Sequence, residues 1–314
     1  MEVAVRIAVF GAGGVGGYFG ARLVNAGQDV TFIARGMHLE AIRRDGLRVS
    51  SIKGDCVVRP AHVTDDPTTV GTVDVVLVSV KAWQVPEIAP EVRTLLGPKT
   101  VVVPLQNGVE AADQLAAVLG REPVVGGLCK IMTAVRAPGH IEHSGLKPTV
   151  VCGELYGTAT RRIERLSGMF QQAGVAVEVP ADIHTEIWKK FLLIAPWGGM
   201  GAVTRVSVEL IRKVPETRDM LADAMREVAC VAVAHGVELE SDIVTRTLTF
   251  IDRLPPEATA SMQRDLDAGR PSELEAQNGA VVRFGNARGI QTPVNAFIYR
   301  VLRPLELTAR GTAC

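Results

Sequence analysis

Three glycines near the start of the chain have the spacing of a pyrophosphate-binding turn. They follow the apolar run of residues 5–10 and open a helical pattern. In such a turn the first glycine allows a tight bend, the second lets a phosphate approach the backbone, and the third lets helix and strand pack closely. The helix start also offers free N–H donors and the positive end of its dipole. We expect a dinucleotide site at Gly11, Gly13, Gly14, Val15 and Gly16, with a plain turn as the alternative.

The residue after the second predicted strand indicates which dinucleotide binds. An NAD site usually carries Asp or Glu about 20 residues beyond the glycines, where it binds the ribose 2′-hydroxyl. Here the strand of residues 30–34 is followed by Arg35. A carboxylate would repel a 2′-phosphate, whereas a guanidinium can pair with it through two hydrogen bonds. We therefore expect NADP(H), and the alternative is a solvated surface arginine.

Two more polar segments follow buried strands. Residues 73–80 lead into the segment from Lys81 to Gln84, and residues 100–105 lead into Gln106, Asn107 and Gly108. The carboxyl ends of strands in open α/β sheets are where ligands bind. A lysine there can neutralise a phosphate, and an asparagine amide can donate to and accept from a carboxylate or carbonyl. A surface charge and an ordinary Asn-Gly turn are the alternatives.

Two adjacent lysines, Lys189 and Lys190, lie in an otherwise apolar helical pattern. Hydride reduction of a ketone develops negative charge on the carbonyl oxygen, and a lysine ammonium can supply the proton that this oxygen needs. Lys190 lies three residues after Ile187 and four before Ile194, on an apolar face where lysine is unusual. Lys189 also has an apolar residue, Leu193, at i+4, so periodicity does not separate the two. The alternative is an amphipathic helix with two snorkelling lysines.

These segments together resemble the ketopantoate reductase (2-dehydropantoate 2-reductase) family, and the resemblance extends over nearly the whole chain. The shared motifs are the glycine turn, Arg35, Lys81-Ala-Trp-Gln84, Gln106-Asn107-Gly108, Trp188-Lys189-Lys190, and Ser261-Met262 with Glu273 twelve residues after the serine. The resemblance implies NADPH-dependent reduction of a 2-keto acid to a 2-hydroxy acid. The first candidate reaction is 2-dehydropantoate to pantoate, in pantothenate biosynthesis.

The resemblance also assigns roles to single residues. It gives cofactor contacts to Arg35, Lys81 and Gln84, and the general acid to Lys190. It gives substrate binding and lysine positioning to Asn107, Ser261 and Glu273, with Asn107 also near the cofactor. A glutamate beside the lysine would orient the ammonium, and a serine hydroxyl can donate to a substrate carboxylate. A surface serine and a glutamate favoured by a helix dipole are the alternatives.

One departure from the family concerns the substrate. Ketopantoate reductases typically carry asparagine four residues after the catalytic lysine, and often again four residues later. Here these positions hold Ile194 and Gly198, on the helix face of Lys190. We therefore keep a more apolar keto acid, an imine or a secondary-metabolite carbonyl as alternative substrates. A non-enzymatic NADP-binding sensor is the remaining alternative.

The order of predicted elements indicates two domains. Strands and helices alternate to about residue 180, and long segments of 3.6-residue periodicity follow. We predict an α/β protein with a doubly wound Rossmann-type NADP-binding domain over residues 1–180. An all-helical substrate and catalytic domain is predicted over residues 181–314, with catalysis in the cleft between the two.

Composition restricts the partners. Lys+Arg and Asp+Glu number 34 each, and no basic tract or apolar run of membrane-spanning length occurs, so we expect neither nucleic acid nor membrane as a partner. The histidines show no metal-ligand spacing, and we predict no metal. The five cysteines are scattered, which favours a reducing, cytoplasmic setting. A small keto acid is the expected partner, and a homodimer is left open.

Overall fold

The computed structural model describes residues 4–157 and 160–312, and by internal contacts the chain divides into two compact units. The first contains Met1–Gln106 and Glu110–Ile183, and the second contains Asn107–Val109 and His184–Cys314. The main division therefore falls at residues 183 and 184, whereas the sequence places the change of domain at residues 180–182. The short segment Asn107–Val109 leaves the first unit and makes its contacts in the second.

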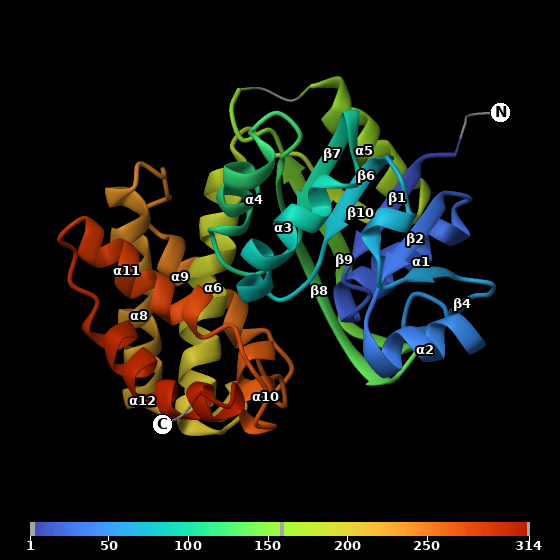
Figure 1. The fold of residues 1–314 in the computed structure, drawn as a ribbon. Coiled ribbons are helices and arrows are strands. Elements are labelled where there is room, and N and C mark those ends of the chain that lie inside the picture. The colour runs from blue at the N-terminus through green and yellow to red at the C-terminus, as the bar shows by residue number, and fades with distance from the viewer. Residues whose placement is uncertain (1–3, 158–159, 313–314) are drawn as a thin grey trace. The chain divides into compact units, whose positions relative to one another are not determined.

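A parallel five-stranded sheet is the centre of the first unit (Figure 1). Its order is β5-β2-β1-β6-β7, so that β1 pairs with β2 on one side and with β6 on the other. The strands are β1 Arg6–Phe10, β2 Asp29–Ile33, β5 His62–Thr64, β6 Val73–Val78 and β7 Leu96–Pro104. The strand order reverses beside β1, where doubly wound sheets bind ligands at their carboxyl edge. The predicted Rossmann-type fold is confirmed.

Helices cover both faces of this sheet. Successive strand residues point to opposite faces, so Ile7 and Val9 of β1 pack with Phe19 of α1, whereas Ala8 and Phe10 pack with α3 and α4. The helices of the unit are α1 Gly14–Asn25, α2 Gly36–Asp45, α3 Val85–Arg93, α4 Ala111–Leu119 and α5 Arg161–Gln172. Two short 3₁₀ turns are η1 Pro67–Thr69 and η2 Ala82–Gln84.

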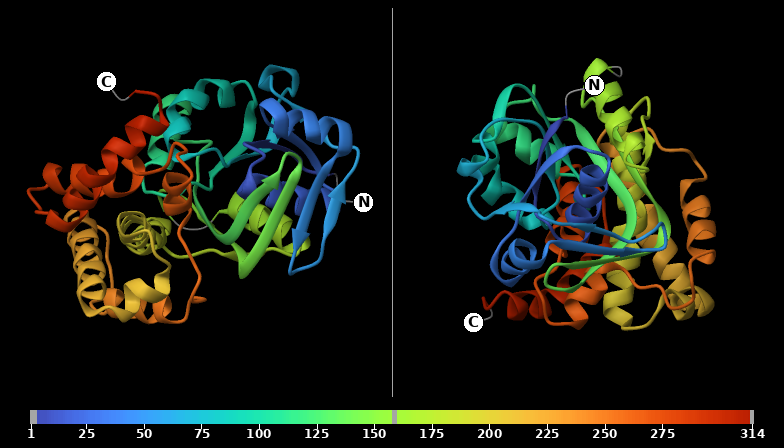
Figure 2. Two further views of the ribbon diagram at one scale, coloured as in Figure 1. Left: turned by 90° about the horizontal axis from the view of Figure 1, so that it is seen from below. Right: turned by 90° about the vertical axis from the view of Figure 1, so that its right-hand side faces the viewer.

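A second sheet in the same unit differs from the predicted alternation of strands and helices. It contains β3 Leu47–Ser51, β4 Cys56–Val58, β8 Gly126–Ala137, β9 His140–Gly153 and β10 Ala176–Glu178. Figure 2 shows β8 and β9 as a long antiparallel hairpin, in green. Residues 139–143 and 149–152 look like two strands in the sequence, because the polar segment between them resembles a loop. They form one strand, since backbone pairing with β8 needs no apolar side chain.

The second unit is all-helical, as predicted (Figure 1). Its helices are α6 Ile183–Thr204, α7 Val208–Lys213, α8 Pro215–Ala234, α9 Ile243–Asp252, α10 Ser261–Asp267, α11 Ala280–Ala287 and α12 Pro293–Ala309. A π-helical turn, η3, spans Glu275–Gly279. The apolar core joins residues of α6, α8, α11 and α12, including Phe191, Met225, Val281 and Ile298. Within the described ranges no helix is long and apolar enough to cross a membrane.

Candidate active site

The glycine turn joins β1 to α1, and its three glycines have different surroundings. Gly11 has a φ of 99°, and a Cβ there would lie 2.8 Å from the backbone nitrogen of Val80. A Cβ on Gly16 would lie 2.2 Å from both Gly11 O and Ser79 Oγ. Gly13, which precedes the first residue of α1, has nothing within 4 Å of its Cβ position. The turn is therefore tightly packed at its two ends and open in the middle, where the free N–H groups of a helix start are found.

Arg35 is the residue before α2 and directly follows β2. Its Nη2 lies 3.2 Å and 3.3 Å from the two carboxylate oxygens of Glu91, on α3. The Arg35 side chain is 61% exposed and that of Glu91 is 39% exposed. An ion pair so exposed contributes little to stability, so the guanidinium remains available to a stronger anionic ligand.

The two polar loops after β6 and β7 are tied to the strands. The Lys81 backbone N–H donates to Gln84 Oε1 (3.1 Å), which fixes the start of η2. Buried Gln106 donates from Nε2 to the backbone oxygens of Val78 (2.9 Å) and Val80 (3.2 Å). Gln106 thus holds the end of β6 in place. Sequence reasoning gave it no role, although it precedes Asn107 in the quoted motif.

Lys189 and Lys190, both half-buried on α6, have different surroundings. Lys189 Nζ lies 2.8 Å from Glu240 Oε1 and 3.2 Å from Glu186 Oε1. Partial burial lowers the pKa of Lys189, but the hydrogen bonds to Glu240 and Glu186 outweigh it and the net pKa is raised. Lys190 has no hydrogen bond or ion pair within the part of the chain that the structure describes. Of the two, Lys190 alone keeps its ammonium uncommitted.

The positions one and two turns beyond Lys190 are apolar or lack a side chain. Ile194 is half-buried, and Gly198 is buried against the α10 side chain of Met262. A Cβ on Gly198 would lie 3.2 Å from Met262 Cε and 3.4 Å from Gln277 Oε1. α6 therefore comes close to α10 and η3 at this glycine.

Glu273 is buried, with 5% of the residue exposed. Its Oε2 accepts a hydrogen bond from Asn107 Nδ2 (3.1 Å) and a longer one from Gln277 Nε2 (3.5 Å). Ser261 is the first residue of α10, and Glu273 lies shortly before η3, so both occupy helix starts as the sequence indicates. Short π-helical turns of this kind are frequent at functional sites.

The structure thus brings together several of the predicted residues of the helical unit. Asn107 contacts Glu273 although 166 positions separate them, and Gln277 contacts Glu273 and lies beside Gly198. The chemistry available here is an uncommitted ammonium on one helix and a buried, amide-bound carboxylate on another.

Family models match both units. Residues 7–157 match the model described as Ketopantoate reductase PanE/ApbA, and residues 182–306 match the model of its C-terminal part. The chain belongs to the ketopantoate reductase family. It is an oxidoreductase of that type, as the recurrence of 2-dehydropantoate 2-reductases among its relatives indicates.

Three relatives illustrate the similarity. A 2-dehydropantoate 2-reductase of Mycobacterium tuberculosis (strain H37Rv) is 32% identical over 96% of this chain and 97% of the relative. The uncharacterized oxidoreductase YkpB of Bacillus subtilis is 29% identical over 96% of this chain and 99% of the relative. The crystal structure of 2-dehydropantoate 2-reductase from Geobacter metallireducens GS-15 has a TM-score of 0.90 and 32% identity, covering 95% of this chain and 99% of that chain.

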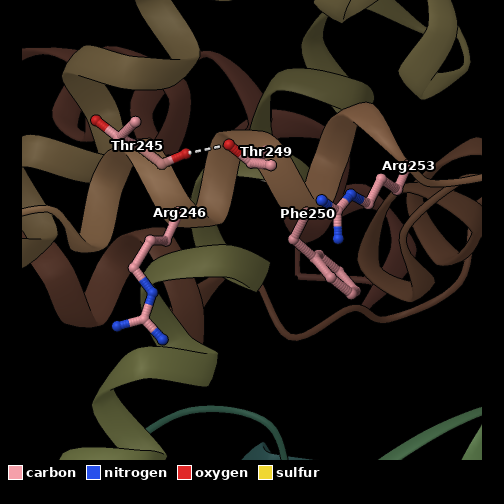
Figure 3. Close-up of a pocket in the computed structure, with 5 residues that line it drawn as sticks. All are labelled: Thr245, Arg246, Thr249, Phe250 and Arg253. Atoms are coloured by element: carbon pink, nitrogen blue, oxygen red, sulfur yellow. Dashed lines mark hydrogen bonds between the residues drawn. The ribbon is translucent and has the colours of Figure 1, made fainter.

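A surface depression on α9 is unrelated to the predicted ketopantoate reductase site. Figure 3 shows its lining residues, which are Thr245, Arg246, Thr249, Phe250 and Arg253. All five come from α9 or the residue that ends it. Thr249 Oγ1 donates to the Thr245 backbone oxygen (2.9 Å), so that hydroxyl is used within the helix. The depression contains no carboxylate and none of the predicted site residues.

Cysteine and metal chemistry add nothing to the site. Cys56, Cys129 and Cys152 are buried thiols and Cys230 is exposed; all four are free, and Cys314 lies outside the described residues. Burial raises the pKa of the Cys152 thiol to about 12. No cluster of three potential metal ligands occurs among the described residues.

Proposed function

We propose that the protein reduces a 2-keto acid to a 2-hydroxy acid with NADPH, and that Lys190 is the general acid. The observation that carries the proposal is the contrast on α6. Lys189 is held by Glu186 and Glu240, whereas Lys190 has no partner within the described residues. A proton donor must be free to reach the oxygen that develops charge, and Lys190 meets this condition.

The residues of the first unit fit a phosphorylated dinucleotide. The open space at Gly13 admits a pyrophosphate to the backbone N–H groups at the start of α1. Arg35, at the end of β2, would bind the 2′-phosphate and exchange its exposed partner Glu91 for a doubly charged one. Lys81 and Gln84, at the end of β6, would add further contacts.

The protein's own residues would act on the substrate as follows. When bound, the reduced nicotinamide supplies the hydride to the keto carbon. Lys190 Nζ then gives its proton to the carbonyl oxygen, which leaves the hydroxyl of the product. Glu273, held by Asn107, would orient the ammonium. Ser261 and Asn107 would bind the substrate carboxylate, because hydroxyl and amide groups donate to it.

The residues beyond Lys190 bear on the choice of substrate. 2-Dehydropantoate is the first compound to test, since that activity names several relatives. Ile194 and Gly198, however, offer no side-chain donor to a substrate hydroxyl, and Met262 lies beside Gly198. A site that leaves a substrate hydroxyl unpaired loses about 1–3 kcal/mol. Branched and aromatic 2-keto acids are therefore the second class to test.

The decisive assay follows NADPH oxidation with a panel of 2-keto acids, in wild type and Ile194→Asn. Turnover of any 2-keto acid supports the reductase, and the ratio of kcat/KM values between 2-dehydropantoate and the apolar acids assigns the substrate. We expect Ile194→Asn to move that ratio toward 2-dehydropantoate. A strong wild-type preference for 2-dehydropantoate with no gain in the variant would contradict the apolar-wall argument.

NADPH binding without turnover of any acid in the panel would favour a sensor over an enzyme. This outcome is recognised by calorimetric titration of NADPH alongside the assay. A homodimer, the assembly left open by the sequence, is tested on the same preparation by sedimentation analysis.

A further inference from the structure

Ser272, the residue before Glu273, is held on three sides by the last helix of the chain. Its backbone N–H donates to Glu306 Oε1 (3.2 Å) and Oε2 (3.0 Å), and its hydroxyl donates to Oε2 (2.5 Å). Its carbonyl oxygen accepts from Arg310 Nη2 (3.1 Å). Ser272 is completely buried. Every polar group of this one residue is therefore bound to α12.

The Glu306 carboxylate is itself buried and fully used. The residue is 6% exposed, and Arg310 Nε donates to Oε1 (2.6 Å). A buried charge is costly unless it is paired and hydrogen-bonded, and here both oxygens accept two bonds each. Charge-assisted bonds of this kind are short and strong. The arrangement of Ser272, Glu306 and Arg310 is called the α12 clamp below.

The α12 clamp fixes the backbone that carries Glu273. The Ser272 carbonyl belongs to the planar peptide that joins it to Glu273, so the bond from Arg310 sets the orientation of that peptide. The Ser272 hydroxyl also accepts from the Leu274 backbone N–H (3.2 Å), on the other side of Glu273. The side chain of Glu273 is held separately, by Asn107.

We propose that Glu306 and Arg310 are positioning residues that set the Glu273 carboxylate for its work beside Lys190. This inference rests on the proposed function, since it assigns a purpose to Glu273. The clamp lies 33 positions from Glu273 in sequence and touches it only through Ser272. Its effect should therefore appear in kcat rather than in cofactor binding.

The chain offers a matched control on the same helix. Glu227, on α8, is also buried and also binds backbone N–H groups of α12, those of Val294 (2.7 Å) and Asn295 (2.9 Å). It accepts a further bond from Asn295 Nδ2 (2.7 Å). Glu227→Gln therefore weakens the docking of α12 by the same chemistry as Glu306→Gln, but at the opposite end from Ser272.

The experiment compares Glu306→Gln, Glu227→Gln, Glu273→Gln and the Glu306→Gln/Glu273→Gln double variant. Misplacing a catalytic group can cost orders of magnitude in rate, so we expect Glu306→Gln to lower kcat by about tenfold with the NADPH Kd unchanged. Glu227→Gln should lower the melting temperature comparably and leave kcat within about twofold. In the Glu273→Gln background, Glu306→Gln should cost no further activity, because coupled residues are non-additive.

Additive losses in the double variant, or equal losses of kcat in Glu306→Gln and Glu227→Gln, would overturn the proposal. Unchanged kcat in Glu306→Gln, or in Glu273→Gln alone, would overturn it as well while leaving the reductase function standing. If Glu306→Gln does not fold, Arg310→Lys replaces it, because lysine keeps the charge but cannot bridge Glu306 and the Ser272 carbonyl together. The expected pattern in kcat is then the same. The proposed function is tested apart from this, by wild-type turnover and by Lys190.

Discussion

The two units present their candidate residues in opposite ways. In the first unit the site consists of glycines and side chains near solvent, such as Arg35, which is 61% exposed. In the helical unit Glu273 is 5% exposed and bound by neighbouring amides. Substitutions in the first unit should therefore change cofactor binding with little cost in stability, except where glycines are tightly packed. Substitutions in the helical unit should change the rate of the chemical step.

The largest expected effect is in the helical unit. Lys190→Ala should lower kcat by about 10²–10⁴-fold, because general acid catalysis commonly contributes that much. The NADPH Kd and the melting temperature should stay close to wild type, since Lys190 makes no hydrogen bond or ion pair within the described residues. Steady-state kinetics with calorimetry measure both. A full rate in this variant would remove the basis of the proposed mechanism.

Two glycines of the turn should separate packing from binding. Gly16→Ala places a Cβ 2.2 Å from Gly11 O and Ser79 Oγ and should destabilise the protein by about 1–3 kcal/mol. Gly13→Ala meets nothing within 4 Å, so its stability should be unchanged while NADPH binding weakens. Thermal unfolding and calorimetric titration check the pair. Equal stability losses in both variants would contradict the distinction.

Arg35 provides the test of cofactor choice. Arg35→Ala should weaken NADPH binding by about tenfold or more, because a charge-assisted hydrogen bond contributes about 1.5–3 kcal/mol, and it should leave NADH binding unchanged. Glu91→Gln should strengthen NADPH binding slightly, since it removes the carboxylate that pairs with Arg35. Titrations with both cofactors measure this. Equal wild-type affinities for NADPH and NADH would defeat the assignment of NADP(H).

The smallest effect is expected one residue from the largest. Lys189→Ala removes ion pairs with Glu186 and Glu240, which should cost about 0–1 kcal/mol of stability and leave kcat near wild type. The measurement is the same kinetic assay as for Lys190→Ala, run in parallel. A large loss here instead would mean that the wrong lysine has been assigned as the acid.

The predictability of the molecule from its sequence follows the same division. The strands of the first sheet are apolar runs bounded by turn residues, so their pattern sufficed to predict them. The strand β9 was predicted as two pieces, because hydrogen bonds to β8 continue through its polar middle. The glycine turn was predictable because its spacing is local.

The contacts of the helical unit could not be derived from periodicity. Asn107 meets Glu273 across 166 positions, and Glu306 meets Ser272 across 34. Neither pair leaves a local pattern, since each depends on how helices pack after they form. Helical phase also failed to separate Lys189 from Lys190, because the difference between them lies in Glu240, 51 residues beyond Lys189.

The segment Asn107–Val109 has a consequence for anyone recombining this protein with a homologue. It is encoded between β7 and α4, inside the first unit, yet its contacts belong to the second. A chimera joined at residues 183 and 184 would pair the asparagine of one parent with the glutamate of the other. A hybrid that also transplants residues 107–109 from the donor of the helices would keep that pair together, so the natural exchangeable module is discontinuous in the gene.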